Sequence, residues 1–96
     1  MEASVILNDV LARYAGDAAL EAGGVSGLTR DAAEVTGSDG AFDVDLHVEL
    51  AWGAGAEEVS KDVQRRVAEY LERMANVRVG SVDVVVERVG VPPAKR

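Results

Sequence analysis

The sequence contains no cysteine among its 96 residues, and only four of them are aromatic. The missing thiol excludes disulfides, thiolate nucleophiles and cysteine-based zinc sites. No apolar run approaches the ~20 residues that are needed to span a bilayer. The N-terminal residues lack the basic and long apolar regions of a signal peptide. We therefore expect a cytoplasmic protein with a core of small branched side chains.

Basic residues are also scarce. Lysine and arginine total 10 against 17 aspartates and glutamates, which gives a net charge of -7. Nucleic-acid binders of this size usually carry a basic stripe that neutralises phosphates. The acidic balance therefore argues against DNA or RNA as the main partner and against direct adsorption to an anionic membrane. The length predicts one domain, and a hydrophobic fraction of 48% argues against general disorder.

The most informative stretch is residues 42–52. Apolar residues occupy every even position, and every odd position except Ala51 is polar or charged. Because side chains on a strand alternate between faces, this pattern predicts one long strand with an apolar and a polar face. Such a strand is typical of an open sheet that is covered on one face only.

Two segments have the periodicity of helices that are apolar on one side. The first covers residues 8 to about 22, and the second covers residues 57–74, with Asn76 as a left-handed stop. Opposite charges four residues apart support the second helix by about 0.2–0.5 kcal/mol per pair. The expected apolar stripes are Val10, Leu11, Tyr14, Ala15, Ala18 and Ala22, then Val59, Val63, Val67, Tyr70, Leu71 and Met74, and the charge pairs are Glu57–Lys61, Asp62–Arg66 and Glu69–Arg73.

The remaining segments predict further strands. Residues 25–28 form a short strand, residues 30–35 either form another or do not, and Asp39-Gly40 predicts a hairpin into the long strand. The last strand lies within residues 77–89, with Val82, Val84 and Val86 toward the core. We predict a single two-layer α+β domain over residues 1–91. Two helices pack on one face of a mostly antiparallel sheet of three or four strands, in the order helix, strand, optional strand, strand, helix, strand. Residues 92–96 form a flexible tail.

The segments in this order resemble the bacterial alkaline shock protein family. Residues 24–28 are similar to its Gly-Val-x-Gly-hydrophobic segment, and residues 44–53 to its Val-Asp-Leu-x-Val-x-Val-x-Tyr-Gly strand. Residues 82–86 match its closing Val-x-Val-x-Val strand. The resemblance covers residues 6–91, although Leu7 stands where the family usually has a capping serine, and Gly55-Ala56 replaces its Ile-Pro type helix start.

The resemblance implies a non-enzymatic, cytoplasmic protein that is linked to envelope stress. Such a protein gathers at the membrane through a membrane-anchored partner and self-associates. The family has no catalytic residues or cofactor to transfer. We therefore expect an interaction or scaffold protein that acts through protein–protein contacts.

The polar strand face is the candidate interaction surface. Like charges on neighbouring strands cost stability unless something compensates, so the face is a contact surface for a basic partner, a weak cation site or a solvated face. Neighbours on one strand face are about 7 Å apart, which disfavours a metal, and we predict none. Outward-facing Val85 and Val89, beside Ala51, suggest self-association. The candidate residues are Asp43, Asp45, His47, Glu49, Asp83, Val85 and Glu87.

Short patterns in the sequence suggest two other functions. Residues 24–27 match the bare G-x-x-G of a KH-like nucleic-acid-binding module, but that loop should join two helices and be flanked by basic residues. A hydrolase would need a positioned nucleophile beside His47, and Ser26 lacks the pattern of a nucleophile elbow. The KH-like module is the alternative, and enzymatic activity is not expected.

Overall fold

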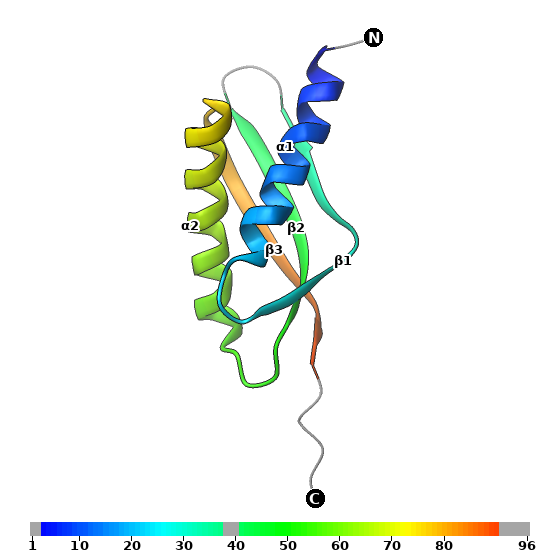
Figure 1. Cartoon of the computed structure of the whole chain (residues 1–96), viewed down its shortest axis with the longest axis vertical. Coiled ribbons are helices and arrows are strands. Elements are labelled where there is room, and N and C mark those ends of the chain that lie inside the picture. Colours follow the sequence, from blue (N-terminus) through cyan, green and yellow to red (C-terminus); the bar gives the residue numbers. More distant parts are fainter. Residues whose placement is uncertain (1–2, 38–40, 91–96) are drawn as a thin grey trace, which may run out of the picture.

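The computed structural model describes residues 3–37 and 41–90. Both helices lie on the same face of a twisted sheet (Figure 1). Within the described residues the sheet has three strands in the order β1-β2-β3. The predicted two-layer α+β fold is therefore confirmed. In chain order its elements are α1 (Ala3–Leu20), β1 (Val25–Thr36), β2 (Phe42–Leu50), α2 (Ala56–Ala75) and β3 (Val79–Val89).

The two strand pairings differ in direction. β1 and β2 are antiparallel, as predicted, although the Asp39-Gly40 turn lies outside the described residues. β2 and β3 are parallel, with Val44 beside Val82 and Leu46 beside Val84. The sheet is therefore antiparallel in only one of its two pairings. The reason is that α2 carries the chain back along the sheet before β3 begins, which makes β2-α2-β3 a parallel crossover unit.

The region that the sequence left ambiguous belongs to β1. Residues 30–35 continue the strand that begins at Val25, so no separate fourth strand forms among the described residues. The register against β2 shifts between Leu28 and Ala33. Such an irregularity breaks the two-residue alternation, and for this reason the pattern was unclear in the sequence.

The core is built on the inward side chains of β2. The even-numbered residues from Phe42 to Leu50 are all buried, as predicted. Trp52 does not follow them and is 58% exposed, because β2 ends at Leu50 and the chain turns at Gly53 with φ +86°.

Helix α1 contributes mostly alanines to this core. It begins at Ala3 and ends at Leu20, so it starts earlier than the predicted start at Asn8. Val10 is 39% exposed, contrary to prediction, because the buried stripe is centred on Leu11 and Ala15. A Cβ at Gly16 would lie 3.1 Å from Leu28 Cδ1, so the absence of a side chain there lets α1 approach the sheet closely.

Helix α2 follows its predicted stripe, with Val59, Val63, Val67 and Leu71 buried. Met74, in the last turn, is instead 55% exposed. Two of the three predicted charge pairs form, Lys61–Glu57 at 3.7 Å and Arg66–Asp62 at 2.8 Å. Glu69 lies 3.5 Å from Arg65 rather than pairing with Arg73, and the helix ends at Asn76 with φ 56°.

Candidate functional site

The face of the sheet that points away from the helices carries the predicted residues. β2 directs its odd-numbered side chains there, and the parallel register places Asp45 beside Asp83 and His47 beside Val85. We call this surface the acidic face. It comprises Asp43, Asp45, His47, Glu49, Asp83, Val85 and Glu87.

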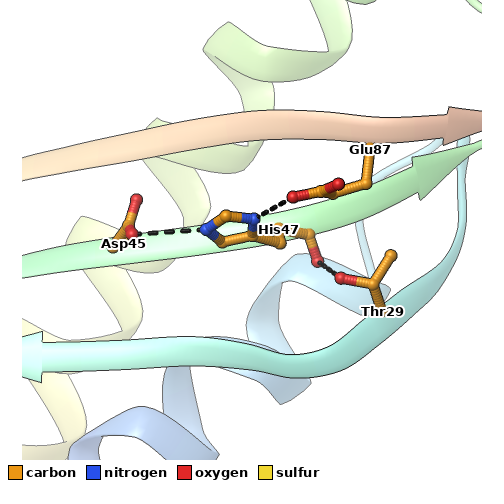
Figure 2. Close-up of polar contacts among 4 residues, drawn as sticks. All are labelled: Thr29, Asp45, His47 and Glu87. Carbon is orange, nitrogen blue, oxygen red and sulfur yellow. Dashed lines mark hydrogen bonds and ion pairs between the residues drawn. The ribbon is translucent and has the colours of Figure 1, made fainter.

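The imidazole of His47 lies between two carboxylates (Figure 2). Its Nδ1 is 2.5 Å from Glu87 Oε2, and its Nε2 is 3.3 Å from Asp45 Oδ2. The hydroxyl of Thr29 donates to the His47 carbonyl at 3.3 Å and ties this position to β1. A protonated imidazole has two N–H donors and a neutral one has a single donor, so this setting favours the charged form.

The pKa of His47 is accordingly raised above 6.5. The hydrogen bond to Glu87 is the largest cause, and the hydrogen bond to Asp45 acts in the same direction. Partial removal of the ring from water acts in the opposite direction and lowers the pKa. The two carboxylates therefore favour the protonated form of the ring over the neutral form.

The same geometry disfavours a metal ion. Each carboxylate faces a different ring nitrogen, so the oxygens lie at opposite edges of the imidazole and do not converge with one nitrogen on one point. Across residues 3–37 and 41–90, no group of three or more His, Asp or Glu side chains is arranged to hold a metal. The arrangement therefore suits the binding of a proton.

Three further residues lie on this side of the sheet, and the sequence reasoning missed them. Arg88 of β3 lies beside Glu49 and brings a positive charge to the edge of the acidic face. Glu34 of β1 lies beside Asp45, so three carboxylates form a row across the sheet together with Asp83. Ser81 donates its hydroxyl to Asp43 Oδ1 at 3.0 Å. The alternation Ala33-Glu34-Val35 is the signal for Glu34 in the sequence, but the shift in register between Leu28 and Ala33 makes the strand hard to recognise there.

The surroundings of the face give little support for the other functions. The G-x-x-G segment leads from α1 into β1 and does not join two helices. Gly24 within it has φ +95°, and a Cβ there would lie 2.6 Å from Val59 Cγ2. The backbone conformation and the close packing therefore explain why this position is a glycine. A hollow of about 130 Å³ lies between α1 and α2, and wider, more open hollows of about 370–390 Å³ lie elsewhere on the surface. None of these four hollows is lined by a residue of the acidic face.

Together these features define a small α+β domain whose sheet is covered by helices on one side and exposes an acidic surface on the other. Residues 33–91 match the alkaline shock protein 23 family, which is described as having a cell envelope-related function. The chain belongs to this family, and the resemblance seen in the sequence is confirmed.

Solved structures with the same fold are forms of the MamM CTD. The copper form has a TM-score of 0.67 at 16% identity, covering 92% of this chain and 92% of that chain. The structure named MamM-CTD has a TM-score of 0.64 at 18% identity, covering 83% of this chain and 96% of that chain. At this level of identity the likeness shows the fold alone. No curated protein matches the chain.

Neither α1 nor α2 is long and apolar enough to cross a bilayer.

Proposed function

We propose that this protein is a non-enzymatic interaction protein of the envelope-stress type that binds a basic protein partner through the acidic face. The observation that carries the proposal is the concentration of carboxylates on a sheet surface that neither α1 nor α2 covers. Like charges on neighbouring strands are destabilising unless something compensates. His47 lies between Asp45 and Glu87, and Arg88 lies beside Glu49, but the carboxylates outnumber these two basic side chains, which supports a use beyond folding. Six carboxylates contribute: Glu34, Asp43, Asp45, Glu49, Asp83 and Glu87.

The proposed partner is a protein with a lysine- or arginine-rich cytoplasmic segment, including a membrane-anchored one. Cytoplasmic segments that adjoin membrane helices carry an excess of lysine and arginine, which complements the charge of the acidic face. In this proposal the protein resides in the cytoplasm and becomes peripheral to the membrane through that partner. Family membership, with its cell envelope-related function, supports this placement.

The test is affinity capture from the native membrane fraction with a triple charge reversal, Asp43→Lys, Asp45→Lys and Glu49→Lys. A matched control reverses Asp9, Asp17 and Glu21, which are exposed on or next to α1 and produce the same change in net charge. We expect the face variant to lose the captured protein and the helix variant to retain it. If the two variants retain it equally, the acidic face is not the contact surface.

A second candidate, self-association, is favoured by one observation. Val85 of β3 is 40% exposed on the acidic face, as the sequence predicted. Val89 is 49% exposed, but the shift in register places it beside Leu50 and not on the acidic face, contrary to prediction. The net charge of -7 opposes contact between copies at low salt, and salt screens such repulsion beyond about 10 Å at 0.1 M. Association should therefore grow with ionic strength. A single monomeric species at high protein and salt concentration in sedimentation would remove this candidate.

A further inference from the structure

The direction of the peptide groups in β3 follows from its parallel pairing with β2. Phe42 N donates to Arg78 O at 2.9 Å, and Gly90 N donates to Leu50 O at 2.7 Å. The backbone N–H and C=O groups of the even-numbered residues of β2 therefore point to β3. The carbonyls of His47 and Glu49 face β1, where hydroxyl groups bind them.

In a parallel pair of strands, a residue whose peptide groups point to the adjacent strand does not hydrogen-bond to the residue directly beside it. It hydrogen-bonds to the two residues before and after that one. Val44, Leu46 and Val48 have Val82, Val84 and Val86 as partners. The residues of β3 that bond to β2 are therefore the ones between these valines. The peptide groups of Val82, Val84 and Val86 point the other way, to the free edge of the sheet.

Helix α2 satisfies only the first part of this edge. Gln64 Nε2 donates to Val82 O at 2.9 Å, and Glu72 Oε2 accepts from Val79 N at 3.3 Å. Beyond Val82, no described residue hydrogen-bonds the outward peptide groups of Val84 and Val86. A row of such groups is a template for another strand.

The side chains along this open stretch specify what kind of strand fits. Asp83, Val85 and Glu87 project onto the acidic face, and Val84 and Val86 lie half-buried on the helix side. A strand added here meets carboxylates on one face and small apolar side chains on the other. Lysine or arginine that alternates with small apolar residues matches both faces at once.

A second copy of this chain fits the same edge poorly. An antiparallel pair of β3 strands centred on Val85 would place Asp83 of one copy directly opposite Glu87 of the other. Centring the pair on Val84 instead brings the two Asp83 carboxylates diagonally together. Like charges in these positions are destabilising, so charge complementarity selects a basic partner.

We propose that the free edge of β3 between Val84 and Val86 binds an extended segment of the basic partner by strand addition. Backbone hydrogen bonds to the two valines give the affinity, and the alternation of the partner's side chains gives the specificity. The inference rests on the proposed function for the charge of the partner, and it adds the conformation of the bound segment and its place on the fold.

The experiment measures the fluorescence anisotropy of a labelled peptide of alternating lysine and valine in the presence of the full chain. Two isomers carry N-methyl groups, one on every valine and the other on every lysine. An antiparallel added strand turns its valine N–H groups to β3, and a parallel one turns its lysine N–H groups. We expect one isomer to lose binding about tenfold or more while the other binds like the parent.

Binding that is unchanged in both isomers, or lost in both, would overturn strand addition, and so would failure of the parent peptide to bind at low salt. In the protein, Val84→Pro is compared with Val84→Ala. Proline removes an N–H that faces the free edge and leaves the ladder with β2 intact. We expect the proline variant to bind the peptide about tenfold more weakly than the alanine variant. The pair Val86→Pro and Val86→Ala repeats the comparison if Val84→Pro does not fold.

The two proposals fail in different ways. If reversing Asp43, Asp45 and Glu49 abolishes peptide binding while Val84→Pro and N-methylation leave it unchanged, the acidic face is used and strand addition is wrong. If the edge changes weaken binding and charge reversal does not, the edge is used and the proposed basic partner is wrong.

Discussion

Neutralising one carboxylate of the acidic face should make the protein more stable. Asp83 lies beside Asp45 on the neighbouring parallel strand, and neighbouring strands are about 4.8 Å apart. Two unit charges about 5 Å apart in water repel by roughly 0.8 kcal/mol, and like cross-strand pairs cost about 0.2–1 kcal/mol. Asp83→Asn removes one such pair and should raise the free energy of unfolding by about 0.5 kcal/mol.

The assay is urea and thermal unfolding at low salt and again at 1 M NaCl. A gain of about 0.5 kcal/mol corresponds to roughly 2–4 °C in Tm for a domain of this size, and it should vanish at high salt because screening removes the repulsion. Glu58→Gln is the control: Glu58 is an exposed acid in the first turn of α2, where the helix dipole favours negative charge, so this change should be neutral or slightly destabilising. A loss of stability in Asp83→Asn, or a gain that salt does not alter, would refute the reasoning.

Four further predictions concern His47, the buried core and the turn at Gly24. Glu87→Gln should lower the pKa of His47, measured by NMR titration of the ring, and an unchanged pKa would contradict the hydrogen bond. Because the folded-state pKa of His47 is raised, its stabilising contribution is complete below its unfolded pKa of about 6.5 and is lost as pH rises through the folded value; His47→Gln should therefore destabilise the protein more at pH 6 than at pH 9. Leu46→Ala, at a fully buried position, should cost about 2–5 kcal/mol in urea unfolding, and a cost under about 1 kcal/mol would argue against the inward face. Gly24→Ala should cost at least about 1 kcal/mol, because Gly24 has φ +95° and a Cβ would clash with Val59; unchanged stability would count against this turn.

Strand β2 could be predicted from the sequence because burial on one face alone enforces a strict alternation. Periodicity also predicted the buried side of α2, because one apolar stripe of this helix packs against the rest of the core. The argument failed for Trp52, because the alternation of apolar and polar residues continues in the sequence after the strand has ended at Leu50. It also left residues 30–35 undecided, because the shift in register between Leu28 and Ala33 interrupts the pattern.

The parallel pairing and the His47 cluster depend on relations between strands. The order strand, helix, strand is visible in the sequence and is compatible with a parallel crossover, but the alternation within the last strand does not determine its direction. Which carboxylate meets His47 depends on the exact register, including the shift between Val48 and Glu49 that places Glu87 near the ring. No pattern within one segment contains that information.

The central claim is that the surface facing away from the helices is the one that meets a basic partner. NMR shift mapping during titration with the alternating lysine–valine peptide tests it most directly. The account predicts that the largest shifts fall on β2 and β3, around Asp45, Asp83 and Val85, with little change in α1 and α2. Shifts concentrated on the two helices, with the sheet residues unmoved, would contradict it.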